Sequence, residues 1–365
     1  MTRLMKAAAF LEKGRIEIVE KPIPDVGPND ALIRITTTTI CGTDVHILKG
    51  EYPVEKGLTV GHEPVGVIEK LGSAVQGYTE GQRVVAGAIC PNFNSYAAQD
   101  GVASQDGSYL GARGLCGCHG YKATAGWRFG NLIDGTQAEY VLVPDAQANL
   151  APIPDGLTDE QVLMCPDIMS TGFAGAENAN IKIGDTVVVF AQGPIGLCAT
   201  AGARLLGATT VIAVDGNDHR LDIARKMGAD VTLNFRNVDV ISEVMKLTGG
   251  KGADSSIEAL GTQATFEQAM KVIKPGGTLS SLGVYAEDVK IPLSAFAAGL
   301  GDHTIRTALC PGGKERMRRL MNVIQGNRLD LGLLVTHQRK LDDIVEAYDL
   351  FANQRDGVLK IAIKP

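Results

Sequence analysis

The run Thr186-Val-Val-Val-Phe190 leads directly into Ala191-Gln-Gly-Pro-Ile-Gly196, and residues with helical spacing follow. A continuous apolar run of this length is typical of a strand that is buried on both faces of a parallel sheet. The turn is a variant of the Gly-x-Gly-x-x-Gly pattern, with alanine in the first glycine place. Gly193 would let a pyrophosphate approach the backbone, and Gly196 would let the helix pack on the strand. The stretch favours a dinucleotide-binding turn over a plain strand–helix connection.

Strand-like and helix-like segments alternate beyond this turn. We expect further strands at 211–214, 231–235, 255–258 and 278–283, and helices at 194–207, 220–227, 240–247 and 264–273. Repeated strand–helix units predict an α/β fold, in which a doubly wound parallel sheet has helices on both faces. The first half differs, since β-branched runs at 31–36, 65–69 and 83–86 alternate with glycine-containing turns and indicate a β-rich module. A last strand is expected at 358–363.

The second strand of the α/β region ends at Asp215, 22 residues after Gly193. A carboxylate in this place can accept hydrogen bonds from an adenosine ribose, and it would repel a 2′-phosphate. Asp215 therefore predicts NAD rather than NADP. Arg220, five residues further on, keeps NADP open, because a guanidinium can pair with a 2′-phosphate.

Length and composition restrict the function classes. A chain of 365 residues suggests about two domains of ~100–200 residues each. The net charge of −6 argues against a nucleic-acid or anionic-membrane partner. The N-terminal segment shows no signal-peptide core, and no apolar run is long enough to span a membrane, so a cytoplasmic location is expected. Seven scattered cysteines suit reduced thiols or metal ligands better than a disulfide framework.

Two motifs in the β-rich half carry metal-ligand chemistry. They are Cys41-Gly-Thr-Asp-Val-His46 and Gly61-His-Glu-Pro-Val-Gly66. Catalytic zinc takes three protein ligands and keeps a fourth position open, and cysteine and histidine are among its preferred donors. A single cysteine and a single histidine would more often be a buried thiol and a buried polar residue. The full local pattern makes a catalytic zinc the better interpretation.

With these motifs ahead of the nucleotide unit, the chain resembles the medium-chain zinc-dependent alcohol dehydrogenases over essentially its whole length. Within that family it is most similar to the tetrameric bacterial secondary alcohol dehydrogenases. The segments that carry this closer resemblance are Met164-Cys-Pro-Asp-Ile-Met-Ser-Thr-Gly172, Ala125-Gly-Trp-Arg-Phe129 and Ala308-Leu-Cys-Pro-Gly-Gly313. The resemblance implies a GroES-like catalytic domain at 1–170, completed by 310–365, and a Rossmann dinucleotide-binding domain at 171–309.

The resemblance also implies the ligands of the zinc. Cys41, His62 and Asp167 would bind it, and Glu63 would be a nearby carboxylate able to enter the coordination shell when substrate is absent. Cys165 stays open as a rival to Asp167, because zinc prefers thiolate. Asp44 has two interpretations, either as an orienting partner of the His62 imidazole or as a turn-capping aspartate.

The same resemblance suggests how a proton leaves and where substrate and cofactor bind. Thr43 would accept a hydrogen bond from the alcohol, and His46 would exchange the proton with solvent. The expected substrate pocket is lined by Trp127, Tyr285 and Leu309, with Cys90 and Cys310 as further candidates. The expected cofactor contacts, besides Gly193, Gly196, Asp215 and Arg220, are Thr171, Pro194, Ile195, Gly261 and Gly283.

The activity implied is the interconversion of small secondary alcohols and ketones, with hydride transfer to and from NAD. Alternatives are a zinc-dependent polyol or other alcohol dehydrogenase, or the same reaction with NADP. Many relatives hold a structural zinc with four cysteines, but here that region has only Cys90, Cys116 and Cys118, so one zinc per subunit is expected. A homotetramer is expected from the resemblance alone.

Overall fold

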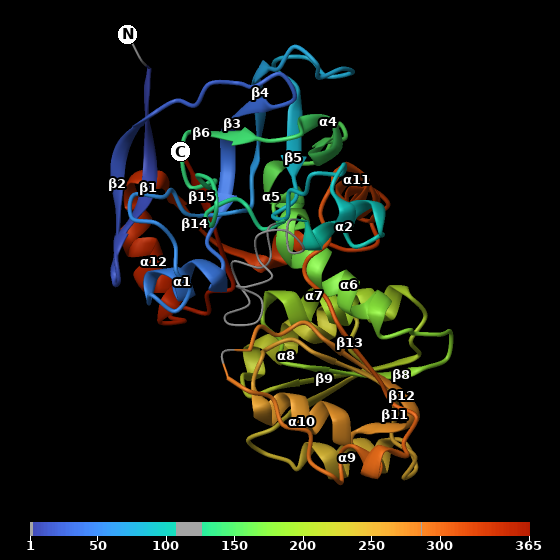
Figure 1. Ribbon diagram of the computed structural model, residues 1–365. Coiled ribbons are helices and arrows are strands. Elements are labelled where there is room, and N and C mark those ends of the chain that lie inside the picture. Colours follow the sequence, from blue (N-terminus) through green and yellow to red (C-terminus); the bar gives the residue numbers. More distant parts are fainter. Residues whose placement is uncertain (1–2, 107–125, 286) are drawn as a thin grey trace. The chain divides into compact units, whose positions relative to one another are not determined.

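The computed structural model describes residues 3–106, 126–285 and 287–365. The chain divides into two compact units (Figure 1). The discontinuous unit comprises residues 1–170 and 310–365, and the inserted unit comprises residues 171–309.

The inserted unit is built on a six-stranded parallel sheet with the strand order β10-β9-β8-β11-β12-β13. Its strands are β8 (Thr186–Phe190), β9 (Thr210–Asp215), β10 (Val231–Asn234), β11 (Ala253–Glu258), β12 (Ile273–Ser281) and β13 (Thr304–Thr307). Its helices are α6 (Ser170–Asn178), α7 (Pro194–Leu205), α8 (Asp218–Lys226), α9 (Val240–Leu247) and α10 (Gln263–Lys271). The order reverses beside β8, as in doubly wound dinucleotide-binding folds, where ligands bind at the carboxyl ends of the strands.

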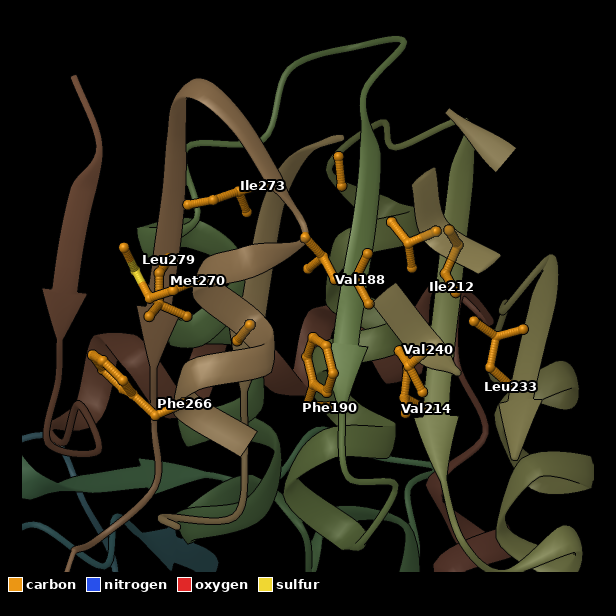
Figure 2. Close-up of a cluster of buried hydrophobic side chains, with 14 of the residues drawn as sticks. Val188, Phe190, Ile212, Val214, Leu233, Val240, Phe266, Met270, Ile273 and Leu279 are labelled. Atoms are coloured by element: carbon orange, nitrogen blue, oxygen red, sulfur yellow. The ribbon is translucent and has the colours of Figure 1, made fainter. Parts of the chain in front are cut away.

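The apolar run of β8 is buried on both faces. Val188 and Phe190 pack with side chains of α9 and α10 on one face (Figure 2). Val187 and Val189 point to the opposite face, where they pack with alanines of α6 and α7. Successive side chains of a strand alternate between faces, so a strand covered on both sides has to be apolar throughout. The doubly wound α/β prediction is confirmed.

The turn after β8 depends on one glycine for close packing. A Cβ on Gly196 would lie 1.8 Å from the carbonyl oxygen of Ala191, so a larger residue cannot occupy this place without a shift of the backbone. Gly193 caps the N-terminus of α7, and a Cβ there would meet nothing within 4 Å. Ala191 adopts a left-handed conformation, with φ of 68°, which disfavours side chains with a Cβ.

The discontinuous unit is β-rich. A seven-stranded sheet has the order β14-β15-β3-β4-β5-β7, with β6 also paired to β3, and β1 and β2 form a separate hairpin. Its strands are β1 (Leu4–Glu12), β2 (Arg15–Pro22), β3 (Ala31–Thr39), β4 (Val65–Leu71), β5 (Arg83–Ala86), β6 (Tyr140–Val143), β7 (Leu150–Pro152), β14 (Val335–Lys340) and β15 (Lys360–Lys364). Its helices are α1 (Gly42–Leu48), α2 (Tyr96–Gln99), α4 (Ala146–Asn149), α5 (Asp159–Val162), α11 (Lys314–Gln325) and α12 (Ile344–Ala352), with a π-helical turn at Cys165–Met169.

The bounds of several segments differ from the expectation by a few residues, and strand β12 begins at Ile273 instead of residue 278. The helix expected at 264–273 ends at Lys271, because Ile273 already pairs with Ala253 in β11. Strand β13 has four exposed residues and therefore no apolar alternation by which the sequence could have predicted it. Among the described residues, no helix is both long enough and apolar enough to cross a membrane.

Candidate metal centre and nucleotide edge

Four side chains from three separate segments of the discontinuous unit meet at one place. Cys41 lies at the N-terminus of α1, directly after β3. His62 and Glu63 lie in the segment before β4, and Asp167 lies in the π-helical turn. Each offers one donor atom, and these atoms lie within 4.8 Å of one another. All four residues are less than a tenth exposed.

The separations of the donor atoms suit a zinc ion. The Oδ2 of Asp167 lies 3.4 Å from the Sγ of Cys41 and 3.5 Å from the Nε2 of His62. Tetrahedral zinc with bonds of ~2.0–2.3 Å would hold neighbouring donor atoms about 3.3–3.6 Å apart. Thiolate, imidazole and carboxylate are also the donor types that zinc takes. The residues present therefore fit the metal.

The structure brings Asp167, and not Cys165, to the other donors. The thiol of Cys165 is fully buried, and its Sγ lies 4.0 Å from the Sδ of Met169. Burial raises the pKa of this thiol, so an isolated thiolate is disfavoured there. Short π-helical turns are frequent at functional sites, and this one sets which residue of the segment faces the donor group.

Asp44 combines the two roles that the sequence left open. Its Oδ2 accepts a hydrogen bond from the backbone N–H of Cys41 at 2.8 Å and thereby caps α1. Its Oδ1 lies 3.6 Å from the Nδ1 of His62, and neither atom has another hydrogen-bonding partner among the described residues. A carboxylate on the second ring nitrogen is the usual way to orient a metal-binding histidine.

The sequence did not reveal the groups that hold Asp44 in place. The Nε2 of the fully buried Gln137 donates to the Oδ2 of Asp44 at 3.2 Å. The hydroxyl of Tyr348, in α12, donates to the Oε1 of Gln137 at 2.9 Å. This chain of contacts joins residues that are more than 90 positions apart, and no local motif marks it.

Burial and neighbouring charges change the proton affinity of two donors. Burial disfavours a charged imidazole, but the carboxylates of Asp44 and Asp167 outweigh it and raise the pKa of His62 well above its usual range. Burial raises the pKa of the Cys41 thiol, although the ammonium of Lys360 opposes this. Without a cation, both groups therefore tend to keep their protons.

Glu63 has a partner that sequence reasoning missed. The ammonium of Lys360 donates to both carboxylate oxygens of Glu63, at 2.8 and 3.0 Å, and to the carbonyl of Ile40 at 3.2 Å. Burial opposes the ammonium charge, but Glu63, Cys41 and Asp167 outweigh it and raise the pKa of Lys360. The only available signal was a lysine directly before the apolar run Ile361-Ala-Ile363 of the C-terminal strand.

The two residues expected to handle the proton lie on α1. The Oγ1 of Thr43 is 3.8 Å from the Sγ of Cys41, so this hydroxyl borders the donor group. His46 is partly exposed, its Nδ1 is paired with the carboxylate of Glu51, and its ring stacks on Tyr52 with 4.7 Å between centroids. This pairing holds the pKa of Glu51 below its usual range.

One buried aromatic side chain lies beside the proposed metal ligands. The buried ring of Trp127 meets His62 edge to face with 6.3 Å between centroids, and it meets Tyr52 in the same way at 6.2 Å. Cys310 lies next to the backbone of Asp167, with its Sγ 3.8 Å from that carbonyl oxygen. Cys90 instead belongs to the buried core of the β-rich sheet.

The other two expected pocket residues belong to the inserted unit. The Tyr285 hydroxyl donates to the Oε2 of Glu258 at 2.7 Å, and its ring packs edge to face on Phe266. Burial raises the pKa of this phenol. Leu309 is half-buried and is the last residue of the unit.

Asp215 lies at the carboxyl end of β9 and is nearly buried. Its Oδ2 accepts the backbone N–H of Gln192 at 2.6 Å, and its Oδ1 accepts that of Asn217 at 2.9 Å. Asn217 in turn caps α8, the helix that carries Arg220. Because a carboxylate has about four acceptor positions, Asp215 can accept further hydrogen bonds while it organises both turns.

The remaining predicted cofactor residues lie around the same edge of the sheet. Pro194 and Ile195 form the first turn of α7, and Thr171 lies in the first turn of α6. Gly261 and Gly283 touch, since a Cβ on Gly283 would lie 2.1 Å from the amide nitrogen of Gly261. The loops after β11 and β12 can therefore meet only because both residues lack a side chain.

Comparisons with known proteins agree with this geometry. Residues 27–155 match the model of the alcohol dehydrogenase GroES-like domain, and residues 194–326 match that of the zinc-binding dehydrogenases. An alcohol dehydrogenase of Cupriavidus necator is 86% identical over 365 residues, which is the whole of both chains. The chain belongs to the zinc-dependent alcohol dehydrogenase family. The protein is therefore an alcohol dehydrogenase that acts on a small-molecule substrate with zinc and a nicotinamide cofactor.

More distant relatives add detail about the family. The NADP-dependent isopropanol dehydrogenase of Entamoeba histolytica is 37% identical, covering 99% of this chain and 96% of its own. The solved alcohol dehydrogenase TADH from Thermus sp. ATN1 is 29% identical, with a TM-score of 0.85 and 99% of each chain covered. The family and the combination of a GroES-like and a Rossmann fold, both predicted from the sequence, are thereby confirmed.

The structure describes one of the three cysteines considered for a second metal, namely Cys90. The other two, Cys116 and Cys118, lie outside the described residues. Within the described ranges, the group around Cys41 is the one set of neighbouring metal-binding side chains.

Proposed function

We propose that the enzyme interconverts small secondary alcohols and their ketones, with NAD as the hydride acceptor. The observation that carries the substrate class is the donor set of Cys41, His62 and Asp167, in which an aspartate stands where thiolate is the commoner choice. Asp167 lies in the segment Met164–Gly172, which is one of the three that carry the resemblance to the secondary alcohol dehydrogenases. Relatives that are 35–37% identical carry the name isopropanol dehydrogenase, which supports the same substrate class.

In this proposal Cys41, His62 and Asp167 hold the zinc. When bound, zinc supplies a Lewis acid that makes an alcohol hydroxyl more acidic, and the nicotinamide supplies the hydride acceptor. Thr43 accepts the hydrogen bond of the alcohol hydroxyl and thereby orients it. Trp127, which packs against His62, excludes water from one side of the substrate and presents an apolar surface to its alkyl groups.

His46 exchanges the proton with solvent. It is suited to this role because its side chain is 45% exposed and its Nδ1 is already paired with Glu51. That pairing leaves Nε2 as the ring nitrogen that is able to accept a proton.

The preference for NAD is proposed from Asp215. Two backbone amides hold its carboxylate at the carboxyl end of β9, in the place where a ribose hydroxyl would be bound. A 2′-phosphate would meet this negative charge.

A specific observation favours NADP as the second candidate. A Cβ on Gly216 would lie 3.0 Å from the Nε of Arg236, so this guanidinium lies beside the same turn. Arg220 is close in sequence, and the isopropanol dehydrogenases at 34–37% identity are named NADP-dependent. Two cations could bind a 2′-phosphate despite Asp215.

Steady-state kinetics with 2-propanol, ethanol and a polyol, each with NAD and with NADP, tests the proposal. We expect the highest kcat/KM with 2-propanol and NAD. A higher value with ethanol or the polyol would overturn the substrate class, and a higher value with NADP would overturn the cofactor assignment alone.

We further propose one zinc per subunit and a homotetramer. Association is supported by strand β13, which ends the parallel sheet with exposed residues, Ile305 among them. Exposed edge strands of this kind are typical places for pairing with another chain. Elemental analysis of the purified enzyme and its mass by light scattering test both points, and two zinc ions or a monomer would contradict them.

A further inference from the structure

A lysine that no motif predicted is buried beside the proposed zinc ligands. Lys360 begins β15 and is only 1% exposed, and Glu63, its partner, is completely buried. All three ammonium hydrogens have acceptors, namely both oxygens of Glu63 and the carbonyl of Ile40. A buried charge is tolerated only when it is paired and hydrogen-bonded, and this one is fully satisfied.

Glu63 therefore lies between two possible partners. Its carboxylate belongs to the same donor group as Cys41 and Asp167, within 4.8 Å of them, but both of its oxygens are bound by Lys360. A catalytic zinc needs three protein donors and one open position. Cys41, His62 and Asp167 already supply three, so a fourth donor from Glu63 would occupy the position that substrate requires.

The balance of charges at the site also indicates that Glu63 pairs with Lys360 and not with the metal. The thiolate of Cys41 and the carboxylate of Asp167 together neutralise a divalent cation. Glu63 adds a third anion to a buried site, and Lys360 supplies the cation that balances it. Without Lys360, the carboxylate of Glu63 would be left unpaired in a medium of low dielectric constant, where the metal would be its strongest remaining partner.

We propose that Lys360 is a positioning residue that holds Glu63 away from the metal and thereby keeps one coordination position free for the alcohol. This inference rests on the zinc site proposed above. It adds a residue from the last strand of the chain to the requirements of the active site. In the resting arrangement the Glu63 carboxylate is bound by Lys360. Glu63 can therefore reach the metal only when its ion pair with Lys360 is broken.

The test compares Lys360→Met with wild type as purified holoenzyme. Three quantities are measured: the rate of zinc release to a chelator, the d–d absorption of the cobalt-substituted enzyme, and kcat. We expect zinc release to slow by roughly tenfold, cobalt absorption to weaken as the coordination number rises, and kcat to fall. The control is Lys364→Met in the same strand, whose ion pair with Glu160 is partly exposed, and it should leave all three quantities unchanged.

A second variant separates the role of the freed carboxylate from damage to the fold. Lys360→Met with Glu63→Gln removes both buried charges, and we expect it to lose the slow zinc release of the single variant and to show the cobalt spectrum of wild type. If Lys360→Met does not fold, Lys360→Gln takes its place, since its amide can still donate to Glu63 without charge. Unchanged or faster zinc release with an unchanged cobalt spectrum would overturn the proposal. A wild-type enzyme without zinc at this site would overturn the proposed ligand set instead.

Discussion

The Oδ1 of Asp44 lies 3.6 Å from the Nδ1 of His62, while the other oxygen of the same carboxylate caps the backbone N–H of Cys41. One side chain thus orients two of the three proposed zinc ligands. The Oδ1 of Asp44 orients the imidazole of His62 through the ring nitrogen that does not face the metal. The Oδ2 fixes the start of α1, where the thiol of Cys41 projects. The metal centre should therefore depend on Asp44 almost as strongly as on a ligand.

Replacing Asp44 with asparagine should weaken zinc binding by about 10–100-fold, because the amide keeps one acceptor for the helix cap but loses the charge that orients His62. Competition with a chromophoric chelator measures the affinity. Asp25→Asn, at an exposed position, serves as the control and should bind zinc like wild type. Equal affinities for the two variants would contradict the orienting role.

The choice between Asp167 and Cys165 can be tested directly by metal content. Asp167→Ala should be purified with little zinc, because it removes the donor closest to both Cys41 and His62. Cys165→Ala should retain a full complement, because this thiol contacts Met169 instead. Elemental analysis of both proteins distinguishes them, and zinc loss in the Cys165 variant alone would reverse the assignment.

Zinc uptake by metal-free enzyme should release protons. The pKa of His62 and that of Cys41 are both raised, so each group holds a proton before the metal binds and has to lose it afterwards. Apparent zinc affinity should therefore increase with pH, by up to roughly 100-fold per pH unit if two protons are released. Competition titrations at several pH values measure the slope, and a pH-independent affinity would be the contrary result.

The two glycines of the nucleotide turn should respond differently to alanine. Gly196→Ala places a Cβ 1.8 Å from the Ala191 carbonyl, so it should lower the free energy of unfolding by about 1–3 kcal/mol or more. Gly193→Ala meets no protein atom and should leave stability within about 0.5 kcal/mol, while the Cβ obstructs the pyrophosphate and weakens cofactor binding. Denaturant unfolding and cofactor titration separate the effects. Unaltered cofactor binding in Gly193→Ala would argue against a phosphate contact there.

Thr43→Ala should lower kcat by roughly 100-fold and leave zinc content unchanged, because the hydroxyl receives the hydrogen bond of the alcohol without being a ligand. Thr43→Ser, which keeps the hydroxyl, should retain most of the activity. Steady-state kinetics and elemental analysis on the same preparations give both values. A Thr43→Ala variant as active as wild type would exclude this role.

Local patterns predicted the inserted unit well. The apolar run of β8 and the helix at 240–247 have the expected bounds. Burial on both faces of a sheet leaves a continuous apolar run, and an amphipathic helix leaves a periodic pattern of apolar residues. Strand β13 left no such trace, since all four of its residues are exposed. The motifs around Cys41 and His62 likewise predicted donor types, because zinc selects among few side chains.

The sequence by itself determined the doubly wound fold, the family and the chemical types of the metal donors. Only the tertiary structure decided which residue of the Cys165–Met169 turn reaches the donors, because the direction of a side chain depends on the helical geometry around it. It also decided the partner of Glu63. Lys360 is 297 residues away along the chain, and the two charges meet only because β15 is added to the same sheet as β3 and β4. Local patterns record which side chains are present, whereas contacts between distant segments depend on the packing of the whole unit.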